Sequence, residues 1–424
     1  MRPSRSFLPK LAVALTFASG VARAGNDDEI PIGSEASMTG AAVTATVQDG
    51  AAGYYNPAGL ANSDRPTLDV AADCYGFRLA RSPDLLTNAE GKESEARAID
   101  WVLVPSMVTY TRTIMGAWQA SLGIFLPQTS DMIFRAELDG DAGARWQVAT
   151  RYEHSHYNYT LSAATKLHPS LRVGGSLIGV YMASVESVQV GGGLEEGPAF
   201  TYSRLKDLSL YGLAIGGGVQ WDVVKNLVIG ASARTPTFAP LRTVDNTELA
   251  MVSDQDGDTT IQSENSTQTL WGAAWTSPSR FRLGVAYRFD AGGWVSVDGD
   301  VATPIVVEYA DDRDWNYNVR AGGVIPVSSN IEVGAGVFTD RSPYRGSPVD
   351  FYGGTAGIRV GQDHAVDGVR QLTFATTLAA RYAYGTGEMP GARVPTDDVD
   401  DWGPTGVRVR YHEMSAVIGG TVYF

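Results

Sequence analysis

Apolar residues recur at every second position along much of this 424-residue chain. In the segment 280–290, which reads RFRLGVAYRFD, apolar side chains alternate with arginine, glycine, alanine and aspartate. The segments 118–126, 371–382 and 413–424 alternate in a similar way. Successive side chains of a β-strand point to opposite faces of the sheet. Each of these segments therefore predicts a strand with one apolar and one polar face.

The connections between the predicted strands fall into two length classes. Tight connections occur at 168–170, 222–225, 290–292 and 326–329. Long polar connections are predicted at 80–100, 128–154, 185–207, 239–275, 341–350 and 386–409. Alternation of short turns and long loops is typical of a transmembrane β-barrel. The segments from Leu68 to Phe424 predict about fourteen strands of about ten residues each, enough to cross a bilayer when tilted.

Tryptophans support the membrane interpretation because they fall near predicted strand ends, as interface girdles require. They are Trp101, Trp118, Trp221, Trp294 and Trp315. A secreted β-sandwich would also alternate, but its loops would not sort into short and long sets. The predicted fold class is therefore all-β, a transmembrane antiparallel barrel.

The N-terminus predicts export from the cytoplasm. Residues 1–24 combine a basic start, an apolar run of about a dozen residues and a small-x-small ending at Ala22-Arg23-Ala24, which is the pattern of a cleaved signal peptide. Its removal takes the formal net charge from −14 to −18, because residues 1–24 hold four basic residues and no acid. A chain this acidic is not expected to bind nucleic acid, because nucleic-acid phosphates require a basic surface. The single cysteine, Cys74, excludes an internal disulfide and a multi-cysteine metal site.

One stretch near the N-terminus cannot be a strand. Residues 49–62, DGAAGYYNPAGLAN, are rich in small residues and follow the similarly small-residue segment 33–50. The motif YYNPAGLA after an aspartate resembles the FadL/TodX-type family of outer-membrane long-chain fatty acid and hydrocarbon transporters. The segments VPSMVTY, TSPSRFRLGVAYRF and NVRAGGVIPVSSNIEVGAGVFTDRSP, and the C-terminal TVYF, resemble the same family. The resemblance covers nearly the whole chain after residue 24.

The resemblance implies a small helical hatch, residues 25–65, inside a barrel formed by residues 66–424. The hatch and gating residues would be Asp49, Tyr54, Tyr55, Asn56, Pro57, Ala58 and Gly59. Asp49 is suited to cap a short helix over 50–55, and Asn56 is turned away from helical geometry by the proline that follows it. An exposed N-terminal turn is the alternative interpretation. The family also implies a lateral exit through a kinked third strand, for which Gly123 and Pro127 are the candidates.

Polar positions on the inward faces carry several arginines, among them Arg280, Arg282 and Arg288. A guanidinium group suits a ligand carboxylate, but the same residues could simply form ion pairs with acids of the lumen. Phe125 and Phe338 are candidates for an apolar lining. Both interpretations of the arginines stay open at this level.

Motifs of catalysis and metal binding are weak. The chain has no G-x-S-x-G or H-E-x-x-H motif, DQDGD (254–258) lacks the later ligands of a calcium loop, and HSH (154–156) has no evident third ligand. We therefore predict no enzyme, no catalytic residues, no metal and no cofactor.

Together these features predict a monomer in the bacterial outer membrane, in contact with its lipids and lipopolysaccharide. The predicted function is passive, hatch-gated passage of hydrophobic small molecules such as long-chain fatty acids or hydrocarbons. The loops 191–207 and 245–260 are polar and acidic, which makes fatty acid a less secure substrate than a hydrophobic compound in general. A porin for polar solutes or a structural or adhesive surface barrel is the alternative.

Overall fold

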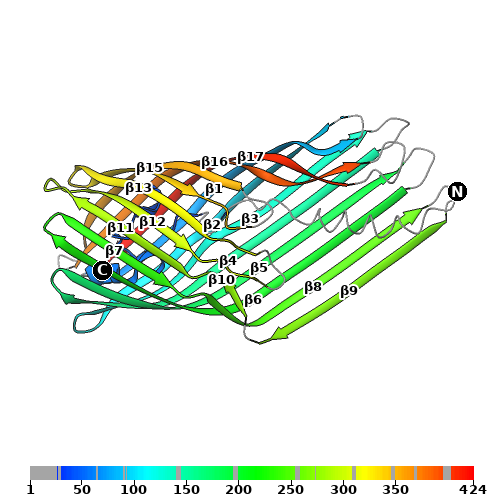
Figure 1. The fold of residues 1–424 in the computed structure, drawn as a ribbon. Coiled ribbons are helices and arrows are strands. Elements are labelled where there is room, and N and C mark those ends of the chain that lie inside the picture. Colours follow the sequence, from blue (N-terminus) through cyan, green and yellow to red (C-terminus); the bar gives the residue numbers. More distant parts are fainter. Residues whose placement is uncertain are drawn as a thin grey trace.

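The strands form one sheet that closes into an elongated barrel with small helices inside it (Figure 1). This computed structural model describes residues 26, 30–63, 65–88, 91, 93–139, 145–193, 199–253, 258–272, 274–307, 312–344, 349–366, 370–394 and 403–424. The predicted signal peptide, residues 1–24, and most of the DQDGD motif lie outside the described residues. In the described part no helix is both long and apolar enough to cross a membrane.

The helices belong to the N-terminal segment, and the strands make up the rest. The helices are α2 (Ser34–Met38), α3 (Ala52–Tyr55) and the 3-10 helix η1 (Pro57–Asn62). The strands are β1 (Thr67–Asn88), β2 (Glu93–Met115), β3 (Trp118–Asp139), β4 (Arg145–His168), β5 (Leu171–Gly193), β6 (Ala199–Val224), β7 (Leu227–Arg234), β8 (Thr237–Ser253), β9 (Thr259–Trp271), β10 (Trp275–Ser277), β11 (Arg280–Arg288), β12 (Trp294–Ala302), β13 (Asn316–Ser328), β14 (Ile331–Asp340), β15 (Val349–Val366), β16 (Arg370–Val394) and β17 (Gly403–Tyr423).

Two positions in the wall are shared by more than one strand. Both β7 and β8 pair with β6, so together they span the height of one wall strand. In the same way β9, β10 and β11 lie beside β8 and β7. Counted like this, the described residues make fourteen antiparallel wall strands, and pairing of Thr67 on β1 with Tyr423 on β17 closes the ring. The predicted fold class is confirmed.

The strands are longer than predicted, because most of the expected outer loops continue the wall. β1 to β6 have 22 to 26 residues. Along β3 the polarity of the two faces inverts: Leu122 and Ile124 point outward near its start, whereas near its end Arg135 points outward and Phe134 points inward. The charged residues on the outer face of this extension resemble a loop in the sequence, although they alternate on a strand.

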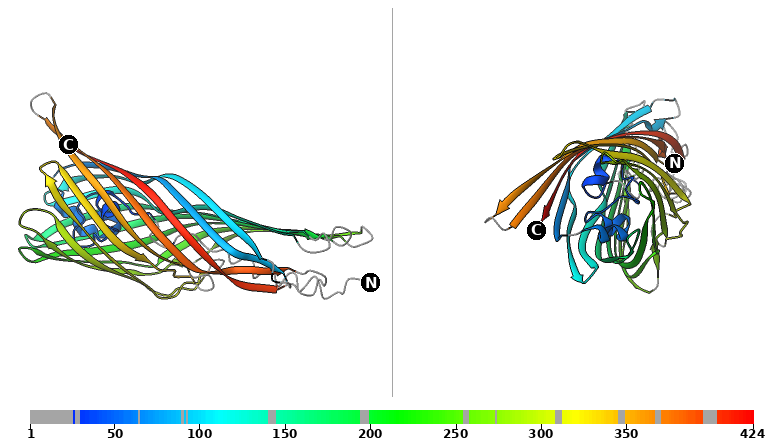
Figure 2. Two further views of the ribbon diagram at one scale, coloured as in Figure 1. Left: turned by 90° about the horizontal axis from the view of Figure 1, so that it is seen from above. Right: turned by 90° about the vertical axis from the view of Figure 1, so that its left-hand side faces the viewer.

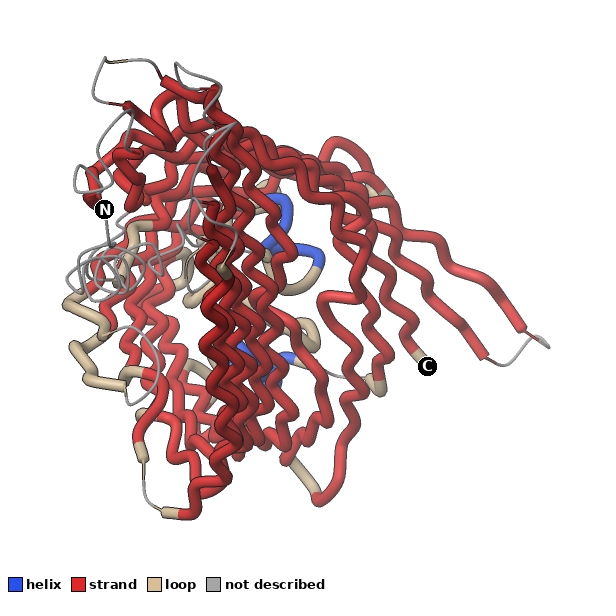
Figure 3. Tube along the Cα trace, turned by 90° about the vertical axis from the view of Figure 1, so that its right-hand side faces the viewer, coloured by secondary structure: helices blue, strands red, loops and turns tan. Residues whose placement is uncertain are grey.

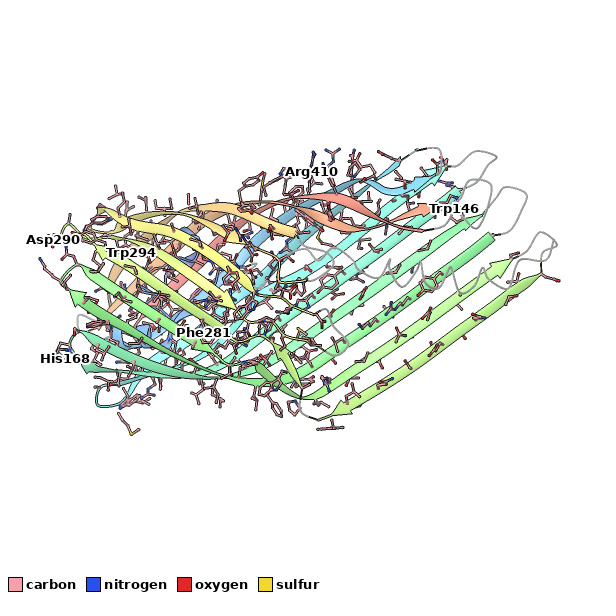
Figure 4. All side chains as sticks on the ribbon, in the orientation of Figure 1. Trp146, His168, Phe281, Asp290, Trp294 and Arg410 are labelled. Atoms are coloured by element: carbon pink, nitrogen blue, oxygen red, sulfur yellow. The ribbon has the colours of Figure 1, made fainter. Side chains whose placement is uncertain are left out.

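The two ends of the barrel differ (Figure 4). The tight turns near His168 and Asp290 lie at one end together with the C-terminus, and Trp146 lies near the other end, where the strands extend furthest. In a transmembrane barrel the short turns face the periplasm and the long connections face outward. By this rule the end with the tight turns is the periplasmic end, and the end near Trp146 is the outer end.

Four of the five predicted girdle tryptophans face outward. Trp101, Trp118, Trp221 and Trp315 are 70%, 45%, 48% and 54% exposed. The prediction for Trp294 is wrong, because the even-numbered residues of β12 point inward and Trp294 packs against the apolar clusters around the plug.

Candidate functional site

The N-terminal segment fills the periplasmic part of the lumen as a plug, which we define as residues 30–63. Views along the barrel and from its outer end show the helices enclosed by strands (Figures 2 and 3). The wall approaches the plug backbone closely where it carries glycine. A Cβ atom at Gly336 would lie 2.1 Å from the carbonyl carbon of Thr39, and one at Gly218 would lie 2.0 Å from Oδ1 of Asn56. These two wall positions therefore exclude any side chain while the plug is seated.

Polar side chains of the wall hold the plug through its backbone. Asp298 accepts a hydrogen bond from the N–H of Thr44 at 2.7 Å, and Asp69 accepts one from the N–H of Gly50 at 3.1 Å. Further wall donors reach carbonyl oxygens of the plug: Ser232 to Tyr55 (2.7 Å), Thr355 to Met38 (2.8 Å) and Gln220 to Val47 (3.1 Å). The anchors come from β1, β6, β7, β12 and β15, so the plug is fastened around the ring and not at a single hinge.

Asn56 of the NPA motif connects the plug to the wall. Its side chain is fully buried and donates to the carbonyl oxygens of Thr44 (2.8 Å) and Val219 (3.0 Å). Its Oδ1 accepts from the N–H of Ala58 at 3.2 Å, which caps η1. One side chain thus joins two turns of the plug to β6.

Most of the other predicted hatch residues pack closely against the plug backbone or the wall. Asp49 accepts a hydrogen bond from the N–H of Ala51 at 3.1 Å, just before α3, which is shorter than the helix expected over 50–55. Pro57 lies against Gly174, and Ala58 is fully buried. A Cβ atom at Gly59 would lie 2.1 Å from the carbonyl oxygen of Val47, so this position also requires glycine.

Tyr54 and Tyr55 face an arginine of the wall. The guanidinium of Arg282 lies 5.1 Å and 5.0 Å from the centroids of the two rings and donates to the carbonyl oxygen of Tyr54 at 3.3 Å. The hydroxyl of Tyr55 accepts from the N–H of Ile32 at 3.0 Å, which ties the start of the plug to α3. Tyr54 also contacts Phe125, with ring centroids 5.8 Å apart.

One carboxylate binds three of the lumen arginines. Asp300 lies 2.8 Å from Arg280, 2.9 Å from Arg282 and 3.3 Å from Arg320, and its side chain is 4% exposed. A cavity of about 40 Å³ remains beside Arg280, Arg282, Tyr54 and Tyr55. That volume holds a few water molecules and no larger ligand. The seated plug therefore closes this site.

Arg288 does not belong to this group. It lies 3.3 Å from Asp222, which also binds Arg172 at 2.7 Å. Arg280 and Arg288 are separated by eight residues of one strand, roughly 27 Å along its axis. The structure thus places Arg288 nearer the periplasmic turns, and the grouping suggested by alternation alone is not one site.

The wall is interrupted beside Phe125. In the described residues, pairing of β2 with β3 runs from Met115↔Trp118 to Met107↔Phe125 and resumes at Arg97↔Arg135, with no β2–β3 pair between them. The interrupted stretches are 98–106 on β2 and 126–134 on β3, which we call the β2–β3 gap. Pairing of β3 with β4 shifts register between Phe125 and Gln128, around Pro127.

Other groups occupy backbone acceptors of β3 in the β2–β3 gap. The carbonyl oxygen of Pro127 accepts from the N–H of Ile30 in the plug at 3.0 Å, and that of Thr129 accepts from Arg78 at 3.0 Å. Phe125 turns back over Gly123, where a Cβ atom would lie 2.8 Å from its ring. Gly123 and Pro127 therefore flank the point at which β3 leaves β2 and contacts the plug.

The outer half of the lumen contains an apolar cluster that the sequence analysis missed. It gathers inward side chains of β1 to β6 and β15 to β17, including Phe134, Tyr202, Phe351 and Tyr411. The rings of Phe134 and Phe351 lie 6.5 Å and 5.6 Å from that of Tyr411. Phe338 packs against this cluster. The inverted alternation in 128–154 was the signal that could have revealed it.

Phe338 also contacts a charged pair. The guanidinium of Arg381 lies 4.7 Å from the centroid of the Phe338 ring and 3.0 Å from Glu413. The histidines of HSH lie on the inward face of β4, where His154 stacks on Tyr152. Among the described residues, no group of three or more His, Cys, Asp or Glu side chains is placed to hold a metal ion.

Two carboxyl groups of the plug have raised pKa values. Burial in the lumen raises the pKa of Glu35 above its ordinary 4.5 and that of Asp49 well above its ordinary 3.8. The neighbouring Glu35 and Asp69 raise the pKa of Asp49 further, whereas Arg359 opposes both shifts. A cavity of about 330 Å³ at the periplasmic face adjoins these groups. The seated plug therefore favours protonated carboxyls.

This shift predicts that acid holds the plug in place. A carboxyl whose pKa is higher in the seated state stabilises that state fully below its ordinary pKa, and the contribution is lost as the pH rises through the raised value. We expect opening events in single-channel recordings to become more frequent from about pH 4 upward. Asp49→Asn should flatten this dependence, and an unchanged slope in that variant would contradict the assignment.

Comparison with known proteins gives structural matches only. No protein-family model matches the chain, and no curated protein matches it. A Pseudomonas aeruginosa FadL homologue is similar over 94% of this chain and 99% of its own, with 13% identity and a TM-score of 0.64. The chain folds as a FadL/TodX-type barrel.

Two further solved structures share this fold. The CymD monoaromatic hydrocarbon channel covers 94% of this chain and 99% of its own, with 12% identity and a TM-score of 0.56. The P. putida toluene transporter TodX covers 92% and 98%, with 13% identity and a TM-score of 0.54. These matches confirm the fold that the resemblance of the NPA motif to the FadL/TodX-type family implied.

Proposed function

We propose that this barrel is a passive channel of the bacterial outer membrane for hydrophobic small molecules, gated by the plug. The observation that carries the proposal is a lumen that is apolar at its outer end and filled by a plug at its periplasmic end, with an interruption of strand pairing in its wall between β2 and β3. A polar-solute pore needs none of these three features. The similar structures include a monoaromatic hydrocarbon channel and a toluene transporter, which supports the same class of ligand.

Capture would take place on the apolar cluster. The inner faces of the extended strands bury aromatic and aliphatic side chains such as Phe134, Trp146 and Tyr411. A hydrophobic ligand that separates these side chains replaces one apolar contact by another, so its entry costs little, whereas a polar solute would have to be desolvated.

Arg280 and Arg282 would meet an acidic head group, if the ligand has one. Three arginines converge on Asp300 here, and a ligand carboxylate could accept hydrogen bonds from Arg280 and Arg282 in the same way. The rings of Tyr54 and Tyr55 cover Arg282, so both tyrosines would have to move when a ligand binds there. This movement would couple ligand binding to the position of the plug.

The exit would be lateral, through the β2–β3 gap. Phe125 lies at the periplasmic end of the β2–β3 gap and contacts Tyr54 of α3. Movement of α3 would therefore shift the side chain that borders the gap. A ligand leaving here enters the apolar phase of the membrane directly and avoids the polar periplasmic end of the plug. Gly123 and Pro127 would provide the geometry and Phe125 the gate.

Uptake of a labelled long-chain fatty acid, by cells lacking their own transporter, tests the function. Cells expressing the intact protein should exceed the empty host. Asn56→Ala/Pro57→Ala removes three hydrogen bonds of the seated plug, roughly 2–4 kcal/mol, and should therefore raise uptake at matched surface levels. Asn226→Ala, in an exposed turn, is the matched control.

Each outcome has a distinct meaning. Uptake equal to that of the empty host would exclude fatty acid as the substrate. Uptake by the intact protein that the double variant leaves unchanged would exclude gating by Asn56 and Pro57 and leave transport standing.

A further inference from the structure

Four arginines form a row on the outer surface of the barrel, on four neighbouring strands. The register pairs are Arg410↔Arg81, Arg81↔Arg97 and Arg97↔Arg135, which link β17, β1, β2 and β3. All four side chains are exposed and point away from the lumen. Figure 4 shows Arg410 on the outer side of the wall. Neighbouring strands lie roughly 4.8 Å apart, so like charges stand directly opposite one another, an arrangement that is unfavourable by itself.

Acidic side chains neutralise only part of the positive charge of this arginine row. Glu95 binds Arg81 at 2.7 Å and Arg97 at 3.0 Å. Of the other acids on these outward faces, Glu137 binds Arg145 and Asp131 binds Arg151. Within the described residues, no ion pair involves Arg135 or Arg410. Both ends of the arginine row thus present a guanidinium without a carboxylate.

The height of the arginine row on the barrel indicates its partner. On β2, the outward residues below Arg97 are Ile99 and Trp101, which are 56% and 70% exposed. Trp101 lies roughly 13 Å along the strand from Arg97. Its ring contacts Phe77, which stands four residues below Arg81 on β1. On β17, His412 contacts Tyr384 two residues below Arg410.

Aromatic girdles mark the boundary between acyl chains and head groups. The arginine row lies directly above such a girdle, at the point where the outer face of β2 changes from apolar Ile99 and Trp101 to charged Arg97. Groups found at this height in an outer leaflet are the phosphates of lipopolysaccharide. A guanidinium fork matches a phosphate through paired charge-assisted hydrogen bonds.

We propose that the arginine row is a binding site for the phosphates of a lipopolysaccharide molecule seated against β17, β1, β2 and β3. This site rests on the proposed outer-membrane location and is separate from the ligand path in the lumen. Arg135 and Arg410 hold the phosphates from either side, while Arg81 and Arg97 share their charge between Glu95 and the lipid. The bound phosphates offset the repulsion between the arginines.

Binding of fluorescent lipopolysaccharide to the purified full-length protein tests this site, with a chelator present to exclude bridging by divalent ions. Arg135→Gln/Arg410→Gln should weaken binding roughly tenfold or more, because the charge-assisted hydrogen bonds are lost. Arg112→Gln, an exposed arginine near the periplasmic end of β2, is the matched control and should bind normally. Dephosphorylated lipopolysaccharide should bind the intact protein as weakly as the intact probe binds the double variant.

A second measurement separates binding from folding. In detergent without lipopolysaccharide the double variant should unfold at a higher temperature than the intact protein, because the like charges are removed. Added lipopolysaccharide should reverse this order, since a ligand stabilises the state that binds it. Unchanged binding in the double variant, equal binding of the dephosphorylated probe, or displacement by inorganic pyrophosphate at equal concentration would each overturn the proposal.

Fatty acid uptake measured in parallel distinguishes the proposed lipopolysaccharide site from the proposed transport function. The double variant should transport normally per folded molecule. Loss of lipopolysaccharide binding with normal uptake supports the arginine row as a separate site. Absence of uptake in the intact protein, with binding retained, would refute the proposed transport and leave the lipid site standing.

Discussion

Deletion of residues 30–63 is expected to turn an almost silent barrel into a steadily conducting pore. The plug occupies the periplasmic part of the lumen and leaves a cavity of about 40 Å³ beside Arg282. Hydrogen bonds from β1, β6, β7, β12 and β15 hold it in place. Without it the inner wall is lined by glycine and polar side chains. Planar-bilayer recordings should show conductance higher by an order of magnitude or more, since about this many strands enclose a wide lumen once it is emptied.

The control for this deletion is the integrity of the barrel. Barrel closure depends on β1–β17 pairing, which begins at Thr67, outside the deleted segment. The deletion variant should therefore keep the heat-dependent migration of a folded barrel. High, steady conductance in the intact protein would contradict the plugged channel and favour the polar-solute porin.

The apolar outer face of the wall could be predicted because the alternation that marks it is visible within each single strand. Phe281 and Leu283 alternate with Arg280 and Arg282, and the structure exposes the first two by 50% and 56%. The same rule missed the outer extension. In that extension charged residues face outward and apolar residues face the lumen, so the alternation remains while the polarity of the two faces is exchanged.

The contacts of the lumen depend on register, which a single strand does not reveal. Arg280 and Asp300 meet because they lie on paired strands, β11 and β12, whose turn sets the offset. The anchoring role of Asn56 likewise needs the position of Val219 on β6. The NPA motif could therefore indicate a plug, but not the contacts that hold it.

The β2–β3 gap left almost no trace in the sequence. The register on its two sides is the same, because Arg97↔Arg135 continues the offset of Met107↔Phe125. Neither strand gains or loses a residue relative to the other across the gap. Gly123 and Pro127 indicate an irregularity in β3, but separation of the strands depends on contacts from elsewhere, such as Ile30 and Arg78.

Joining the two sides of the β2–β3 gap is expected to reduce fatty acid uptake to the level of the empty host. Ile99 and Ile133 would stand opposite each other if the pairing continued, and both are exposed on the outer face. Replacing both with cysteine, in a Cys74→Ser background, allows a short thiol cross-linker to bridge the strands. A reducible linker makes the block reversible, and uptake should return after reduction.

The matched control joins β2 and β3 where they already pair. Val108 and Ile124 are opposite residues of the paired part, and both are exposed on the outer face like Ile99 and Ile133, so linking cysteines there adds no new constraint on the wall. Its uptake should stay normal. If uptake survives a complete cross-link between positions 99 and 133, the ligand does not leave through the wall. The remaining route would pass the plug at the periplasmic end, and the cross-linked protein would then become sensitive to variants of Asn56.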